Sequence, residues 1–332
     1  MLREPFESLR LRCLAALVAF AGVMFLTDRG ARAEEPSPLA AERARDAERP
    51  VLVRPFIAGA LQSLESEQLT LDHPLVTSVG ASVGWKRLKL TASKDVRFVS
   101  DDEPDDLGTV LHTEMLNLAL SVSVPALGRE LVLTPFYSRV KGLQVLGGTS
   151  IVDRNDLWLQ SFGVDALYCL NRNFSYDDRL IELKAREHSS GTFLVKAAMG
   201  RTSVGTDGRP LNAGTDLGSE RPLARSTGFD ANYAEASIGA AGQWLPISHL
   251  SLSGQLSFGT TLANAHVAFA DGTSTSRLAL RPAYSGYGGI GYIGYAVHTG
   301  LLWSYTSENL AIGSDDVTVR RSTVMVYLGV RI

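Results

Sequence analysis

The sequence predicts an all-β protein, a transmembrane antiparallel up-and-down β-barrel of about 12 strands. From Val51 onward, apolar residues alternate with small or polar ones, which is the period of a strand with one apolar face. Many of these runs are about 9–12 residues long, the length that a tilted strand needs to cross a bilayer. All four tryptophans fall near strand ends, as in the aromatic belts of membrane barrels.

The alternation is clearest in three stretches, whose apolar positions are Leu116, Leu118, Leu120, Val122 and Val124; Leu250, Leu252, Leu256 and Phe258; and Val324, Val326, Leu328, Val330 and Ile332. A soluble sandwich would pack this face inward, whereas a membrane barrel turns it toward lipid. A polar face rich in Ser, Gly and Ala favours the barrel. A soluble exported β-sandwich that acts as a binding module is the alternative, and it would be recovered from the periplasm without detergent.

The N-terminus has the features of a secretory signal over residues 1–33. Arg3, Arg10 and Arg12 form a basic region, an apolar run follows from Cys13 to Leu26, and Ala31-Arg32-Ala33 places small residues before Glu34. We expect cleavage near Ala33-Glu34, a flexible periplasmic leader over 34–50 and an outer-membrane barrel over 51–332. This arrangement predicts the outer membrane of a Gram-negative cell.

The pattern indicates thirteen strands, near 51–62, 76–85, 87–96, 112–124, 130–142, 157–170, 174–186, 191–202, 231–244, 248–259, 277–292, 295–305 and 318–332. Two periplasmic termini require an even number. We therefore expect 12 strands, with 174–186 and 191–202 supplying one strand and an irregular piece; 14 is the alternative, if 203–230 hides another strand. Short turns are expected at 86–87, 125–129, 171–173 and 246–249. Long loops are expected at 62–75, 96–111, 143–156, 203–230, 260–276 and 306–317.

Two short motifs lie in the region where the strand count is ambiguous, Asn173-Phe174-Ser175-Tyr176 and His188-Ser189-Ser190-Gly191-Thr192-Phe193-Leu194. They resemble paired motifs of an uncharacterised outer-membrane barrel family, a domain of unknown function best represented in Bacteroidetes-type genomes. The resemblance spans roughly 51–332. It departs from the family at Glu187 and His188, where the family has lysines, and at Ser190 and Thr192. It implies the barrel and its location, and no chemistry.

Catalysis has one candidate pair, His188 and Ser190, which distantly resembles the signature of a 12-stranded outer-membrane phospholipase. A serine near a histidine could be activated as a nucleophile if a third group orients the ring. The asparagine of that signature is missing, so we expect no catalytic residues and no enzyme. A lipid hydrolase remains the alternative, and unchanged lipase activity after Ser190→Ala would eliminate it.

Charged residues on the polar faces of the predicted strands are expected to line the lumen: Arg87, Lys89, Glu182, Lys184, Arg186 and Lys196. They could form a narrow, porin-like channel for small solutes, or a salt-bridged plug in a closed lumen. Because charge inside a narrow barrel must be paired, we expect Glu182 to lie near one of the cations. The tryptophans expected in the interface belts are Trp85, Trp158, Trp244 and Trp303.

The composition limits the classes of partner and cofactor that we expect. A formal net charge of −3 and a pI of about 6.1 give no basic surface for nucleic acid. Cys169 is the only cysteine after residue 33, so an internal disulfide is impossible, and we expect no metal and no cofactor. The expected partners are outer-membrane lipid, lipopolysaccharide and the barrel-assembly machinery, and the expected state is a monomer with a structural or narrow-channel role.

Overall fold

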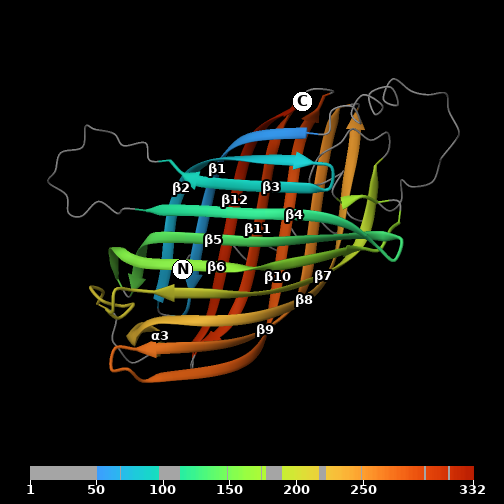
Figure 1. The fold of residues 1–332 in the computed structure, drawn as a ribbon. Coiled ribbons are helices and arrows are strands. Elements are labelled where there is room, and N and C mark those ends of the chain that lie inside the picture. The colour runs from blue at the N-terminus through green and yellow to red at the C-terminus, as the bar shows by residue number, and fades with distance from the viewer. Residues whose placement is uncertain are drawn as a thin grey trace, which may run out of the picture.

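The computed structural model describes residues 51–67, 69–96, 113–147, 149–172, 174–176, 189–216, 222–247, 249–294, 297–312 and 315–332 (Figure 1). The predicted signal and leader therefore lie outside the described residues. Within the described part of the chain, no helix has the length and apolar character needed to cross a membrane.

Twelve strands make up almost all of this structure. They are β1 (Val51–Glu65), β2 (Leu69–Trp85), β3 (Leu88–Asp95), β4 (Glu114–Ala126), β5 (Arg129–Gly147), β6 (Ser150–Cys169), β7 (Ser190–Gly205), β8 (Ser226–Ile247), β9 (Leu250–Phe269), β10 (Ser274–Ile293), β11 (Val297–Ile312) and β12 (Asp315–Arg331). A four-residue helix, α3 (Pro222–Arg225), precedes β8.

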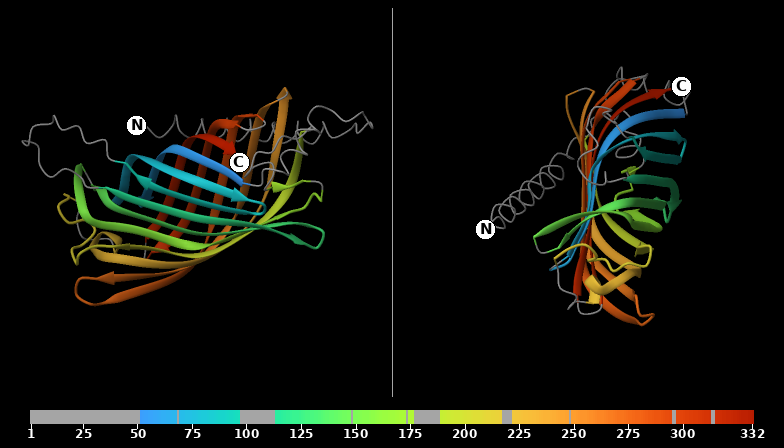
Figure 2. Two further views of the ribbon diagram at one scale, coloured as in Figure 1. Left: turned by 45° about the horizontal axis from the view of Figure 1, so that its top comes forward. Right: turned by 90° about the vertical axis from the view of Figure 1, so that its left-hand side faces the viewer.

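Each strand pairs antiparallel with its neighbours in sequence, and β12 closes the ring on β1, from Leu52↔Arg331 to Glu65↔Thr318. Closure removes the two outer edges that an open sheet would have, so backbone polar groups along the wall can be paired without water. Figure 2 shows the blue and green strands crossing in front of the orange and red ones, which form the opposite wall. The prediction of an up-and-down barrel with 12 strands is confirmed.

Of the pair 174–186 and 191–202, expected to supply one strand and an irregular piece, 191–202 lies in β7 and Phe174–Tyr176 is the irregular piece; residues 177–188 lie outside the described part. The short turn predicted at 171–173 is wrong, since the connection runs from the end of β6 to Ser190. Four predicted long loops, at 62–75, 143–156, 260–276 and 306–317, are mostly strand. We call the end at which β1 begins and β12 ends the turn end and the opposite end the loop end.

The strands extend further at the loop end than predicted because the polarity of their two faces reverses there. The outward face becomes polar and the inward face becomes apolar. On β9 the outward side chains change from Leu252, Leu256, Phe258 and Leu262 to Asn264 and His266, while the inward ones change from Ser253, Gln255, Ser257 and Thr261 to Ala263, Ala265 and Val267. The alternation continues with its phase reversed. A pattern that requires apolar residues on one face therefore places the end of the strand at the membrane boundary. The strand itself continues beyond that boundary.

The wall narrows at the loop end. β3 and β4 stop short of it, and β2 pairs directly with β5, from Leu69↔Gly147 to Asp72↔Gln144. The ring therefore loses two of its twelve strands there and is closed by ten. A smaller ring has an interior that side chains can fill.

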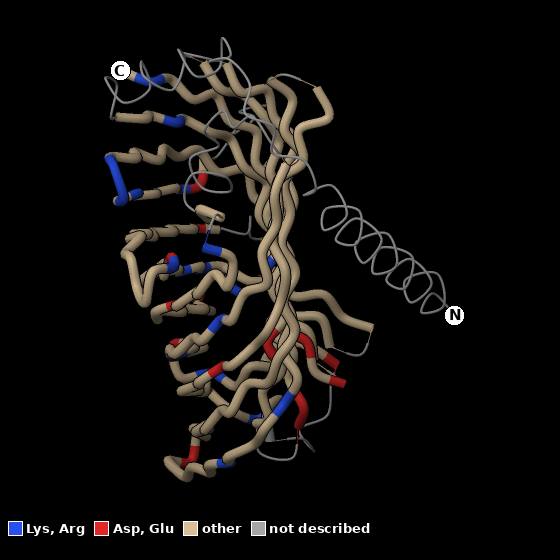
Figure 3. The backbone as a smooth tube through the Cα atoms, turned by 90° about the vertical axis from the view of Figure 1, so that its right-hand side faces the viewer, with Lys and Arg blue, Asp and Glu red and all other residues tan. Residues whose placement is uncertain are grey.

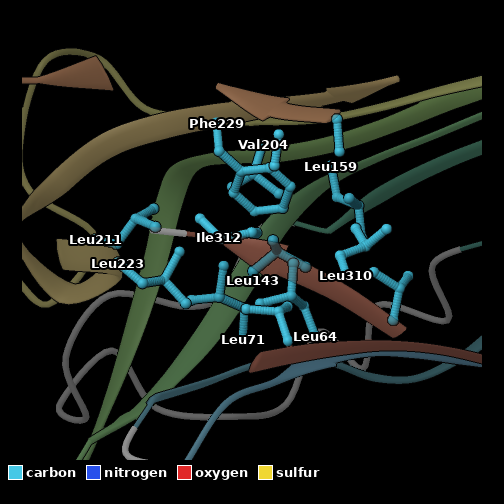
Figure 4. Packing of buried hydrophobic residues seen from close by; sticks show 14 of the residues in the cluster. Leu64, Leu71, Leu143, Leu159, Val204, Leu211, Leu223, Phe229, Leu310 and Ile312 are labelled. Atoms are coloured by element: carbon cyan, nitrogen blue, oxygen red, sulfur yellow. The ribbon is translucent and has the colours of Figure 1, made fainter. Parts of the chain in front are cut away.

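An apolar cluster fills this mouth (Figure 4). We call it the mouth cluster; its larger members include Leu64, Leu71, Leu143, Leu159, Val204, Leu211, Leu223, Phe229, Leu310 and Ile312. They come from both walls and from the 206–225 connection, and Figure 4 shows their side chains converging. Packing of this kind is that of a soluble core, so the loop end is held together by apolar burial inside the ring.

The described parts of the connection between β7 and β8, 206–216 and 222–225, are fixed over the mouth by polar contacts. Arg154 donates to the carbonyl oxygens of Pro210 at 3.0 Å and Ala213 at 3.2 Å. Arg154 is itself held by Asp156, with N–O distances of 2.6 and 2.7 Å. The amide of Leu223 in α3 donates to Asp315 at 3.1 Å. Leu211 and Leu223 are thereby kept inside the ring.

The Arg154–Asp156 pair predicts a response to acid. The hydrogen bond from Arg154 lowers the pKa of Asp156 from 3.8 to about 2. A depressed folded-state pKa contributes stability that is present above about pH 4 and lost as pH falls through about 2. We expect pepsin to cut within 206–216 faster at pH 2 than at pH 4, after normalisation to cleavage of denatured protein. Asp156→Asn should be cut readily at both pH values; equal protection of the wild type at both would contradict the role of the pair.

Candidate functional site

Inside the membrane-spanning part of the barrel, the lumen is lined mainly by small polar residues and by a few charged ones. Charges are sparse on this chain, as the short blue and red segments between long tan stretches in Figure 3 show. Five charged side chains form one group that we call the lumen charge layer: Asp165, Lys196, Glu235, Glu308 and Arg321. Burial of so much charge requires pairing, and the pairs are present.

Two ion pairs organise the lumen charge layer. Lys196 Nζ on β7 lies 3.3 Å from Glu235 Oε1 on β8, and Ser237 donates to the same carboxylate oxygen. Arg321 Nη1 on β12 lies 3.3 Å from Glu308 Oε1 on β11. Asp165 on β6 lies within electrostatic range of both cations. Three carboxylates and two cations give the layer a formal charge of −1.

Arg321 also crosses the lumen. Its Nη2 donates to Ser161 Oγ on β6 at 2.8 Å. β6 and β12 are six strands apart in either direction around the ring of twelve, so this bond joins opposite walls. Ser161 is in turn 3.1 Å from Thr202 Oγ1 on β7. A guanidinium bonded on both sides of the barrel axis obstructs passage at this level.

The turn end of the lumen is obstructed by Phe174–Tyr176, which follows β6. Phe174 is 2% exposed and packs among inward residues that include Val132 and Leu194. The amide of Tyr176 donates to Glu130 on β5, and its hydroxyl donates to Gln255 on β9. The described part of the first sequence motif, Phe174–Tyr176, is therefore an inward-folded plug.

The lumen thus contains three layers among the described residues: the plug at the turn end, the lumen charge layer and the mouth cluster. No group of three His, Cys, Asp or Glu side chains within the described ranges could hold a metal ion. The chemistry of the site is ion pairing and hydrogen bonding across a narrow interior.

The residues predicted to line the lumen lie in different parts of the structure. Lys196 lies in the lumen charge layer, and its partner is Glu235. Lys89 faces inward on β3, next to Gly84 of β2. Arg87 does not line the lumen, because β3 begins at Leu88 and Arg87 lies exposed in the turn before it. Glu182, Lys184, Arg186 and His188 lie outside the described residues.

The other predicted residues lie on the wall. Ser190 begins β7 at the turn end. Trp85, Trp244 and Trp303 project outward and are 48%, 36% and 38% exposed. Trp158 also faces outward but is partly covered, because its ring lies against Gly205.

Four members of the lumen charge layer were missed by the sequence reasoning. Asp165, Glu235 and Arg321 each occupy the polar face of a predicted strand, so face assignment could have found them. Glu308 falls in the predicted loop 306–317, where the reversal of the two faces hides the strand. No sequence signal shows that Arg321 reaches across to Ser161.

The family profile described as "Domain of unknown function (DUF4421)" matches residues 60–330. This chain belongs to the DUF4421 family. The match covers almost all of the ring, from β1 to β12, and includes the plug and the lumen charge layer. A comparison of this DUF4421 chain with curated proteins finds no match.

Solved structures similar to this DUF4421 chain are outer-membrane proteins. The outer membrane protease OmpT from Escherichia coli is 8% identical, with 85% of this chain and 96% of OmpT covered and a TM-score of 0.35. The Pseudomonas putida toluene transporter TodX is 8% identical, with coverages of 92% and 96% and a TM-score of 0.33. A Pseudomonas aeruginosa FadL homologue is 9% identical, with coverages of 85% and 90% and a TM-score of 0.32.

Proposed function

We propose that this protein is a non-catalytic outer-membrane β-barrel with a closed lumen, which serves as a structural element of the membrane and not as an open pore. The hydrogen bond from Arg321 to Ser161 carries the proposal, because it ties opposite walls together in the middle of the lumen. The plug and the mouth cluster support it from the two ends. A lumen filled in this way has no continuous aqueous path.

Electrical recording tests the closed lumen. Purified protein in planar lipid bilayers should give no stepwise increases in ionic conductance, because three layers of side chains separate the two aqueous phases. An open trimeric porin, recorded under the same conditions, controls for insertion and sensitivity. Reproducible conductance steps from the wild-type protein would instead support the narrow channel for small solutes.

We further propose export through a signal over 1–33, cleavage between Ala33 and Glu34, and a periplasmic leader over 34–50. The mature barrel is a monomer without cofactor, inserted by the barrel-assembly machinery and surrounded by outer-membrane lipid and lipopolysaccharide. The outward apolar side chains support this setting: Leu118 and Val326 are 40% and 56% exposed on the outside of the ring.

Fractionation tests the location. We expect recovery in outer membranes, extraction only with detergent, a boiling-dependent shift on gels, and a mature chain that starts at Glu34. Ala33→Phe should block cleavage because it removes the small residue at the cut, while Ala40→Phe should be processed normally. Recovery of the wild type in the soluble periplasmic fraction would refute membrane insertion.

A further inference from the structure

A cavity of about 200 Å³ opens on the outside of the barrel wall near the loop end. Its lining includes Trp158, Gly205, Gly208, Gly228, Asp230 and His266. We call it the outer-wall cavity. It lies on the opposite side of the wall from the lumen, because Trp158, Asp230 and His266 all face outward from their strands.

The strand register fixes the height of the outer-wall cavity. Trp158, Gly205, Gly228 and Ala268 are partners in one row across β6, β7, β8 and β9. The row below is Gln160, Ser203, Asp230 and His266. Two rows further toward the turn end lie Val164, Met199, Ala234 and Leu262, which are apolar throughout. The cavity is therefore level with the lipid headgroups, just beyond the apolar band.

Two glycines give the outer-wall cavity its shape. A Cβ at Gly205 would lie 2.3 Å from Cζ2 of Trp158, so the ring rests directly on the backbone there. A Cβ at Gly228 would lie 2.3 Å from the carbonyl oxygen of Val204. The indole therefore covers the backbone at Gly205, and it is already positioned before any ligand arrives. Such preorganisation reduces the entropic cost of binding.

The charges at the outer-wall cavity are balanced. Asp230 accepts hydrogen bonds from the Ser203 hydroxyl and from Arg201, whose Nη2 lies 2.9 Å from Oδ1. An anionic ligand would meet the Asp230 carboxylate. A cationic ligand would gain little from that carboxylate, because Arg201, which does not line the cavity, already pairs with it. The second carboxylate oxygen and the His266 ring remain suitable for hydroxyl groups, whereas the Thr206 hydroxyl is engaged by the carbonyl oxygens of Arg209 and Thr227.

We propose that the outer-wall cavity binds one neutral sugar ring. An indole side chain offers a large apolar surface for the C–H face of the ring, while Asp230 and His266 hydrogen-bond its hydroxyls. The volume supports a single ring, because pockets for larger ligands occupy about 300–1,000 Å³. The level of the cavity suits a sugar attached to an outer-leaflet glycolipid as well as a free saccharide. This inference does not depend on whether the lumen is closed.

Ligand-observed saturation-transfer NMR on the detergent-solubilised full-length barrel tests the proposal. The probes are methyl β-D-galactoside, methyl α-D-mannoside and N-acetyl-D-glucosamine, with rough-type lipopolysaccharide as the lipid-linked arm. We expect saturable binding in at least one arm. Binding of the free sugars identifies a soluble source, and binding of lipopolysaccharide alone identifies the glycolipid. Inorganic phosphate and choline, which test an anionic and a cationic ligand, should not bind.

Three variants assign the binding to this cavity. Trp158→Leu removes the indole wall, and Gly205→Ala forces the indole off the backbone, so each should weaken binding at least tenfold. Gly288→Ala is the matched control: it is an outward strand glycine whose added Cβ would lie 3.8 Å from Trp303, and it should bind as the wild type does. The boiling-dependent gel shift confirms that each variant is folded. No binding in either arm, unchanged binding by Trp158→Leu, or preference for phosphate or choline would overturn the proposal.

Discussion

Replacing Leu64 with alanine is expected to lower the free energy of unfolding by about 3–5 kcal/mol, because it leaves a cavity in a packed core. Leu64 is fully buried in the mouth cluster, where Leu71 and Val319 are its cross-strand partners. The measurement is the urea midpoint of purified protein in detergent micelles.

Leu61, on the same strand, is the matched control for Leu64. It faces outward and is 46% exposed. Leu61→Ala loses only part of the transfer free energy, since lipid or detergent fills the space, and about 1 kcal/mol is expected. Similar losses at both positions would mean that the mouth cluster does not stabilise the loop end.

Replacing Arg321 with alanine should lower the free energy of unfolding by about 3–5 kcal/mol. The change leaves the buried Glu308 carboxylate without its cation and removes the hydrogen bond to Ser161. The double variant Arg321→Ala, Glu308→Ala should lose less than the sum of the two single variants, because the unpaired charge is gone. Urea titration of the four proteins measures the coupling.

Arg320 provides the control for Arg321, as the next residue on β12. Its Nη1 lies 2.6 Å from Glu65, and both side chains are about a third exposed, at 30% and 33%. Surface pairs of this kind contribute roughly 0–1 kcal/mol. Arg320→Ala should therefore have little effect. If Arg320→Ala and Arg321→Ala lowered the free energy of unfolding equally, the lumen charge layer would not be a stabilising element.

The strand predictions are correct where the outward side chains face the same medium, lipid, along the whole segment. In 250–259 and 324–332 the apolar side chains at alternate positions face outward, and the structure has β9 and β12 there. The predictions failed at 62–75 and 306–317 because the medium outside the wall changes from lipid to water. The strand continues, but its apolar side chains turn inward.

Local alternation predicts the class of secondary structure, and the even count that an up-and-down barrel needs reduces thirteen candidate strands to twelve. The outward direction of the apolar face is indicated by other observations, namely the length of the runs, the tryptophans near strand ends and the Ser, Gly and Ala on the other face. No local pattern predicts that Phe174–Tyr176 folds into the lumen, that Arg321 reaches Ser161, or that Trp158 rests on Gly205. Each of these contacts joins residues whose distance depends on ring closure and strand register, and neither quantity is encoded in the period of a single strand.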